Sequence, residues 1–221
     1  MTARARALSL LIALPASALL ATPATAAPAA TGAPAAVALA AVADSRAALA
    51  PAPTGFTRSK VETDRAITRE RVCSGHVYVL VPSGSGGASA IYSKTTPIAD
   101  GSRVTVLYEQ IVSTPGATTA GKVFNDLRTA ALACQREGKR STKVSAARTV
   151  AGASRAFQVS QVQEGVTITI NVYLKGRSVV QIGAARADVV RGGEPVYVGA
   201  KQGGPLARAF ALKALARPGI G

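Results

Sequence analysis

Apolar residues recur at helical spacing between residues 118 and 137. The stripe consists of Ala120, Val123, Phe124, Leu127, Ala131 and Cys134. Residues three and four positions apart lie on one face of a helix, so this spacing predicts an amphipathic helix over 118–137. Gly138 suits its end because glycine readily adopts the left-handed conformation of a C-cap. The cysteine at the end of the stripe is then expected on the buried face.

Apolar and polar residues alternate strictly from residue 166 to residue 174. Valine, isoleucine and leucine occupy the even positions, while threonine, asparagine and tyrosine occupy the odd ones, which predicts a strand with one apolar face. Content of β-branched residues and flanking turn residues predict further strands over 76–81, 103–112, 156–163, 178–185 and 196–198. A second helix is predicted over 206–217, with Pro205 in its first turn.

The order of these elements predicts the fold class. Strands come first, followed by a helix, by consecutive strands joined through short turns, and by a final helix. Short turns join antiparallel neighbours, because a parallel pair needs a long crossover. We therefore predict an α+β fold: one twisted antiparallel sheet with the helices packed on one of its faces and one disulfide.

The first 26 residues have the organisation of a secretory signal peptide. Arg4 and Arg6 precede an apolar run from Ala7 to Leu20, and small residues follow at 24–26. The apolar run is short for a membrane span, so cleavage near Ala26 is predicted; the alternative is an uncleaved anchor. The mature protein is expected to be secreted, extracellular or associated with the cell wall.

The composition changes after this predicted signal peptide, or leader. Residues 27–53 are rich in alanine and proline, which predicts a disordered tether because such a segment cannot bury a core. Residues 54–221 then form a single domain of ordinary size.

An excess of basic over acidic residues narrows the range of binding partners that we expect. The 221 residues carry a formal net charge of +15, which favours polyanions. The densest basic region comprises Arg136, Lys139, Arg140, Lys143, Arg148 and Arg155. It is a candidate site for an anionic cell-wall polymer or for the lipid head groups of a membrane surface; the alternative is a solvated positive surface. Export argues against a nucleic-acid partner.

Candidate catalytic chemistry is sparse. His76 is the one histidine, and no G-x-S-x-G motif surrounds a serine. The histidine, the cysteines and the scattered carboxylates do not have the spacing of a set of metal ligands. A glycine-rich loop at 84–87 lacks the lysine of a phosphate-binding loop. Glu109 and Glu164 are carboxylates on or near strands, for which exposed positions are the simpler interpretation. We expect no enzymatic activity, no metal and no cofactor.

The chain has two cysteines, Cys73 and Cys134. Cysteines of exported proteins usually pair, so a bridge between strand and helix is predicted; the alternative is two free buried thiols. The bridge would close a loop of 61 residue steps. Loop-closure entropy gives such a bridge at most about 4 kcal/mol of stabilisation.

Three stretches resemble a known family. They are Leu-Ala-Pro-Ala-Pro-Thr-Gly-Phe at 49–56, Ala-Ala-Leu-Ala-Cys at 130–134 and Ala-Asp-Val-Val-Arg-Gly-Gly at 187–193. With them, the chain from about Ala43 to Arg217 resembles the PknH-like extracellular sensor domains of actinobacterial receptor kinases and secreted proteins. The resemblance implies a sheet with helices held by disulfides, here Cys73–Cys134, and binding of an extracellular ligand. It transfers no ligand-binding residue.

These observations lead to three hypotheses about function. The first is an exported, non-enzymatic, sensor-like domain that binds an unknown extracellular ligand. The second is a basic protein of the cell envelope that binds anionic wall polymers or lipid head groups through residues 136–155. The third is a hydrolase without a recognisable motif. A pocket, a flat positive face or a cluster of titratable groups would distinguish them.

Overall fold

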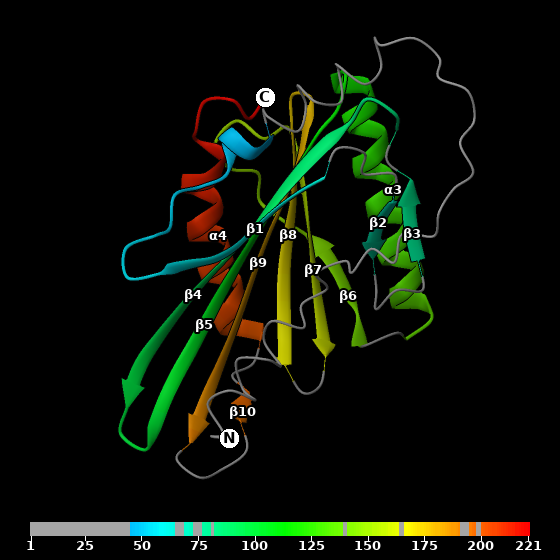
Figure 1. The fold of residues 1–221 in the computed structure, drawn as a ribbon. Coiled ribbons are helices and arrows are strands. Elements are labelled where there is room, and N and C mark those ends of the chain that lie inside the picture. Colours follow the sequence, from blue (N-terminus) through cyan, green and yellow to red (C-terminus); the bar gives the residue numbers. More distant parts are fainter. Residues whose placement is uncertain are drawn as a thin grey trace, which may run out of the picture.

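The computed structural model describes residues 45–64, 69–72, 77–80, 82–138, 141–163, 166–190, 195–197 and 200–221. Their strands are β1 (Thr57–Asp64), β2 (Arg69–Val72), β3 (Val77–Leu80), β4 (Gly86–Ile98), β5 (Gly101–Ser113), β6 (Lys143–Ala146), β7 (Arg155–Gln163), β8 (Val166–Lys175), β9 (Ser178–Val190) and β10 (Pro195–Tyr197). The two long helices are α3 (Ala117–Arg136) and α4 (Ala200–Leu215), shown with the strands in Figure 1.

One large antiparallel sheet organises the molecule. Its strands follow the order β1-β4-β5-β9-β8-β7-β6, and β10 pairs with the far end of β9. β2 and β3 form a separate antiparallel hairpin that contacts α3. The predicted α+β class with an antiparallel sheet is therefore confirmed.

The strongest patterns in the sequence correspond to regular elements. The alternating stretch at 166–174 lies within β8, and the amphipathic stretch at 118–137 forms α3. A two-residue turn joins β8 to β9, in which Lys175 pairs with Ser178. Gly176 lies in that turn with a φ of 51°, a left-handed conformation that glycine adopts without the cost that other residues bear.

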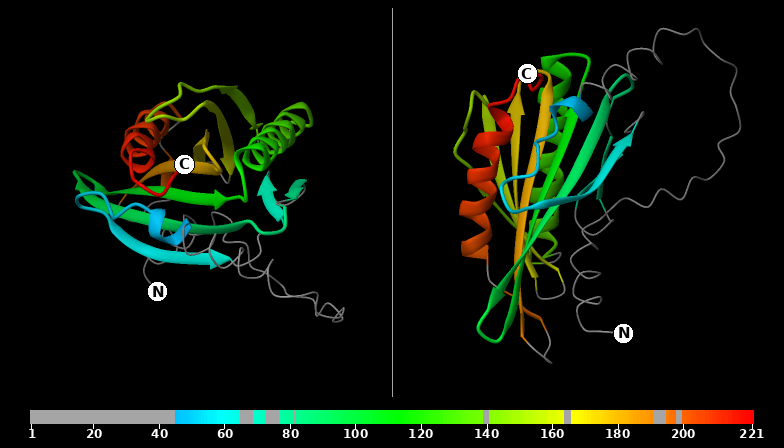
Figure 2. Two further views of the ribbon diagram at one scale, coloured as in Figure 1. Left: turned by 90° about the horizontal axis from the view of Figure 1, so that it is seen from above. Right: turned by 60° about the vertical axis from the view of Figure 1, so that its left-hand side comes forward.

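The two helices pack on opposite faces of the sheet. α4 shares a buried cluster with Tyr173 and Val180, which are paired across β8 and β9. α3 shares a second cluster with their neighbours Leu174 and Val179, which are also paired. Successive side chains of a strand point to opposite faces, so the helices lie on two sides of the sheet, as Figure 2 shows. The prediction that the helices share one face is therefore wrong.

The physical reason is the composition of α4. The polar face of β8 is covered rather than solvated: Thr169 is 0% exposed and Asn171 is 4% exposed. Small residues of α4 allow a close approach, since a Cβ added to Gly203 would lie 3.2 Å from the carbonyl oxygen of Ala184. A face of threonine, asparagine and tyrosine can thus lie beneath a helix of small residues.

Residues 45–50 belong to the core rather than to the tether. Residues 45–48 are helical, and Ala48, Leu49 and Ala50 join the cluster that contains α4. The Ser45 hydroxyl donates to the Ser113 hydroxyl at 2.8 Å. The domain therefore begins before residue 54, because these small and apolar residues find a place between β4, β5 and the C-terminal helix. Residues 1–44 of the predicted leader and tether lie outside the described residues.

Candidate functional site

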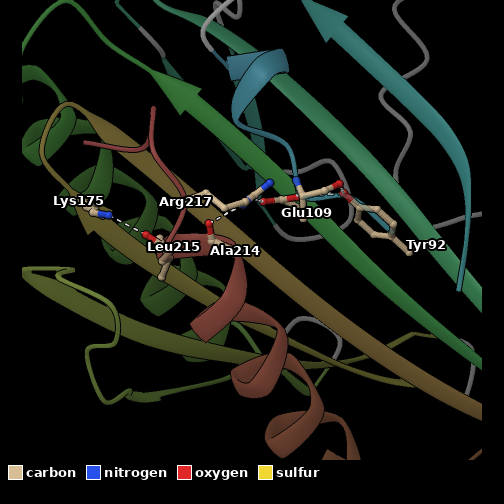
Figure 3. A network of polar contacts seen from close by, with 7 residues as sticks. Tyr92, Glu109, Lys175, Ala214, Leu215 and Arg217 are labelled. Atoms are coloured by element: carbon tan, nitrogen blue, oxygen red, sulfur yellow. Dashed lines mark hydrogen bonds and ion pairs between the residues drawn. The ribbon is translucent and has the colours of Figure 1, made fainter. Parts of the chain in front are cut away.

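A buried carboxylate lies at the centre of the face that α4 covers. Glu109 of β5 is 0% exposed. It shares this face with Leu107 and Ile111, because residues two positions apart on a strand point the same way. Figure 3 shows its carboxylate between Tyr92 of β4 and Arg217, which follows α4.

Three groups from distant parts of the chain hold this carboxylate. The backbone N–H of Ala50 donates to Glu109 Oε2 at 2.7 Å, and the Tyr92 hydroxyl lies 3.0 Å from the same oxygen. Arg217 forms an ion pair with the other oxygen, Oε1. The Tyr92 hydroxyl also lies 2.6 Å from the carbonyl oxygen of Ala50. Glu109 thereby ties the first described residues and the C-terminal segment to the centre of the sheet.

Burial dominates the protonation equilibria of this cluster. It raises the pKa of the Glu109 carboxyl, and the positive charge of Arg217 opposes that rise. Burial also raises the pKa of Tyr92, with a further contribution from the adjacent Glu109 carboxylate. Glu109 has no exposed surface and its oxygens are already hydrogen-bonded, so the cluster is suited to holding the fold together rather than to acting on a substrate.

The C-terminal end of α4 is fixed by two cations. The Lys175 ammonium donates to the carbonyl oxygen of Leu215 at 2.6 Å, and Arg217 Nε donates to the carbonyl oxygen of Ala214 at 2.8 Å. These are carbonyl groups that the helix itself leaves without partners, and cations there also suit the helix dipole. This arrangement, visible in Figure 3, holds Arg217 against Glu109.

The predicted anion-binding residues do not gather on one surface. Arg136, Lys143 and Arg148 are exposed. Val144 packs beneath α3, so its neighbour Lys143 points to the opposite face of the sheet. Arg155, by contrast, lies on the α3 side: its guanidinium donates to Asn125 Oδ1 at 2.7 Å and stands 4.8 Å from the ring centre of Phe124. Lys139 and Arg140 lie outside the described residues.

Cys134 is 0% exposed on the buried stripe of α3, as predicted, and the described residues contain no free cysteine. Its predicted partner, Cys73, lies outside the described residues, as do His76 and Glu164. The pairing of Cys73 with Cys134 therefore stays a prediction. Cys73 directly follows β2, and β2 and β3 both contact α3, so the hairpin that carries Cys73 packs on the helix that carries Cys134.

A second cluster, formed by residues of β4, β5, β8 and β9, lies on the same face of the sheet as α3. We call it the apolar floor. Its buried members are Ile91, Val104, Val106, Ile168, Ala185 and Ala187, with Tyr108, Ile170 and Val189 partly buried. All of these described residues lie on strands, and neither α3 nor α4 contributes a residue to the cluster.

Polar groups border the apolar floor toward the end where α3 lies. The Tyr108 hydroxyl is 2.7 Å from Gln110 Oε1, and the Gln181 amide donates to that same oxygen at 3.0 Å. Gln110 and Gln181 are paired across β5 and β9. The floor therefore combines a wide apolar area with a short polar margin, as binding sites for small molecules commonly do.

The other face of these strands is polar at the same level. Arg103 forms a two-pronged ion pair with Asp188, with distances of 2.6 and 2.7 Å. Thr105 and Arg186 are paired on this face beside them. Arg103 and Thr105 alternate with Val104 and Val106 along β5, so the strand is amphipathic here. Its apolar side forms part of the floor.

Neither cluster was predicted from the sequence. Glu109 was interpreted as an exposed strand carboxylate, which is wrong, because it occupies the same face as Leu107 and Ile111. A charged residue at an apolar position of the alternation is the signal that could have identified it. The apolar floor depends on which strands become neighbours, and the strand order is not apparent from any single stretch.

No three histidine, cysteine, aspartate or glutamate residues among the described residues come close enough to hold a metal ion. None of the helices in this part of the chain combines the length and the hydropathy of a membrane span.

Comparison with known proteins gives a weak likeness of fold. No family model matches the chain, and no curated protein matches it. Among solved structures, the extracellular domain of PknH from Mycobacterium tuberculosis is similar, with a TM-score of 0.48 at 15% sequence identity. The alignment covers 80% of this chain and 97% of that domain. The resemblance predicted from the sequence reaches this level and no further, so no ligand or functional residue is transferred from it.

Proposed function

We propose that the protein is an exported, non-enzymatic, sensor-like domain that binds a small extracellular ligand on the apolar floor. The observation that carries the proposal is the floor itself. Four neighbouring strands gather apolar side chains on the face of the sheet that α3 also occupies, while Arg103 and Asp188 pair on the opposite face of β5 and β9. Binding sites for small molecules are mostly apolar with a few polar groups at their margin, which is the combination of side chains that the floor and its margin offer.

The predicted leader supports the exported part of this proposal. A basic start, an apolar run over 7–20 and small residues at 24–26 direct a chain across a membrane. In an oxidising compartment, a bridge between Cys73 and Cys134 would fasten the β2–β3 hairpin to α3. The structure packs that hairpin on α3, which the bridge requires.

The non-enzymatic part of the proposal rests on how the titratable groups are used. The carboxylate with a clearly raised pKa, Glu109, is buried and accepts bonds from Ala50, Tyr92 and Arg217. Asp188 is paired with Arg103, which lowers its pKa. Each is engaged in holding the fold together, and neither lies on the apolar floor.

The second candidate function is a basic protein of the cell envelope that binds wall polymers or lipid head groups by charge. The exposed side chains of Arg136, Lys143 and Arg148 favour it. The opposite orientations of Lys143 and Arg155 weigh against it, since a flat anionic partner needs cations that face one way. We therefore rank it second.

A thermal-shift experiment distinguishes the two functions. The mature chain is mixed with the low-molecular-weight fraction of a cell-envelope extract, or with the washed envelope at increasing salt. A ligand present at 100 times its dissociation constant stabilises the folded state by about 2.7 kcal/mol, so Tm should rise by several degrees.

The result that would overturn the proposal is equally specific. Tm stays unchanged with the small-molecule fraction, while the protein pellets with the envelope at low salt and is released by a few hundred millimolar salt. A variant with Lys143→Ala and Arg148→Ala would then lose envelope binding, whereas Arg128→Ala, an exposed cation on α3, would retain it. That pattern would establish the charge-based function.

A further inference from the structure

The outward side of α4 is apolar. Of the large apolar side chains that the described residues expose, Leu212 is the most exposed, at 47%. Pro205 and Ala209 are exposed as well, as is Ala216 directly after the helix. These four residues succeed one another at helical spacing, so they form one stripe along α4. The other side of α4 packs on the sheet, and in both views of Figure 2 the helix lies at the outside of the molecule.

The other long helix shows what the outward side of a surface helix ordinarily carries. The exposed residues of α3 include Lys122, Asn125, Arg128 and Thr129. A helix that packs on a sheet usually has an apolar inward side and a polar outward side of this kind. Packing within the described part of the chain therefore explains the outward side of α3 but not the outward side of α4.

Cations border the apolar stripe of α4 on both sides. At about 3.6 residues per turn, Arg208 lies on one side of Leu212 and Lys213 lies on the other. Both of these cations are exposed. No Asp or Glu occurs in the sequence after Glu194, so α4 has no acidic residue of its own to offset them. We call this surface the α4 outer face, and it consists of Pro205, Arg208, Ala209, Leu212, Lys213 and Ala216.

An apolar stripe with positive margins fits the boundary of an anionic lipid bilayer. At that boundary the acyl chains accept apolar side chains while the head groups attract cations. A hydrated anionic polymer offers the charge but no apolar medium for Leu212. A second copy of the chain would bring Arg208 and Lys213 against the same cations, and both copies carry the same strongly positive net charge, +15 for the whole sequence.

We propose that the α4 outer face docks on an anionic phospholipid surface. Leu212 enters the boundary between head groups and acyl chains, and Arg208 and Lys213 lie against anionic head groups. The apolar floor is on the opposite face of the sheet from α4, so docking through α4 leaves the floor turned away from the membrane. The inference goes beyond the proposed function and does not depend on it.

Sedimentation with lipid vesicles measures the docking. Residues 27–221 contain every described residue and lack the apolar run at 7–20, which would itself partition into lipid. This chain should pellet with vesicles of phosphatidylcholine and phosphatidylglycerol. It should pellet far less with phosphatidylcholine alone, because each cation near an anionic surface strengthens binding by roughly fivefold.

Two pairs of substitutions with the same loss of charge locate the docking face. Arg208→Gln combined with Lys213→Gln should weaken binding to the anionic vesicles by roughly tenfold or more. The matched control is Arg136→Gln combined with Lys143→Gln, which removes two exposed cations outside α4. This control should weaken binding by no more than about twofold, through net charge alone.

Tryptophan fluorescence tests whether Leu212 meets the lipid. The sequence contains no tryptophan, so Leu212→Trp gives a signal from that position alone. Its emission should shift to shorter wavelength on anionic vesicles, and brominated acyl chains should quench it. Val61→Trp on β1 is the matched control, because Val61 is also an exposed apolar side chain, at 37%, and its emission should not change. Both positions are exposed, so the measurement holds even where the glutamine variants fold poorly.

Four outcomes would overturn the inference: no binding to anionic vesicles, equal weakening by the two pairs of glutamine substitutions, unchanged emission of Leu212→Trp on vesicles that bind the protein, or binding to an anionic wall polymer but not to vesicles. Weakening by Arg136→Gln with Lys143→Gln alone would instead support the charge-based function that is ranked second. The thermal shift with the small-molecule fraction tests ligand binding separately, so failure of docking leaves the proposed function standing.

Discussion

Removing the guanidinium of Arg217 tests the role of the buried Glu109 cluster. Arg217→Met keeps most of the aliphatic stem but deletes the charge that faces the Glu109 carboxylate. The hydrogen bonds from Ala50 and Tyr92 remain. Glu109, which is 0% exposed, then has no counter-ion.

The magnitude follows from burial. Breaking a buried ion pair by removing one partner typically costs about 3–5 kcal/mol, because it leaves an uncompensated charge. The Arg217 side chain is 18% exposed and Glu109 retains two hydrogen bonds, so we expect the lower half of that range. Arg128→Met on the exposed side of α3 is the matched control and should change stability by no more than about 0.5 kcal/mol.

The loss should depend on pH in a defined direction. Burial raises the pKa of Glu109 above its ordinary value of 4.5, and Arg217 counteracts this. Without Arg217 the pKa in the folded state rises further. The extra destabilisation is therefore fully present only above that raised pKa, and it shrinks as pH falls through it, because the folded state then holds Glu109 neutral.

Urea unfolding at pH 8 and pH 5 measures both effects. Arg217→Met should lose more stability at pH 8 than at pH 5. Combining it with Glu109→Gln should recover part of the loss at pH 8, because the charge left without a partner is gone. A loss of the same size at both pH values, or none at either, would refute the ion-pair argument.

Three other predictions follow from packing, charge and covalent linkage. Gly203→Ala should cost about 1–3 kcal/mol in urea unfolding, since its Cβ would stand 3.2 Å from a carbonyl oxygen of β9, whereas Gly121→Ala on α3, with open space around it, should stabilise by up to about 1 kcal/mol. Asp188→Asn should destabilise the domain more at pH 7 than at pH 3: the paired guanidinium lowers the pKa of Asp188, so its contribution is fully present above its ordinary value of 3.8 and decreases as pH falls through the lowered pKa. Mass spectrometry of the exported protein under non-reducing conditions should find Cys73 joined to Cys134, and Cys134→Ser should cost up to about 4 kcal/mol; alkylation of both thiols without reductant would contradict the pairing.

Local patterns in the sequence predicted the elements that bury one clear face. The stripe over 118–137 became α3, and the alternation over 166–174 became β8. β4 was not predicted. It begins with two glycines, which are typical of a loop, and the alanine, serine and threonine residues that follow show no apolar alternation. Its alanines are buried only because β5 and α4 lie against them.

The arrangement of the elements was harder to predict than their existence. Thr169 gave no sign that a helix would cover it, since the close approach of α4 depends on Gly203, which lies against Thr169. The apolar floor likewise arises when β4, β5, β9 and β8 become neighbours. These are contacts between distant segments, which a periodicity within one segment does not specify.

Native mass spectrometry of the protein recovered after export tests the central claim, ligand binding, most directly. The account predicts that the leader is absent, that a single small-molecule adduct of one equivalent is present, and that denaturation releases it. A folded protein that carries no adduct as exported, and gains none after incubation with the small-molecule fraction of the envelope, would contradict the account.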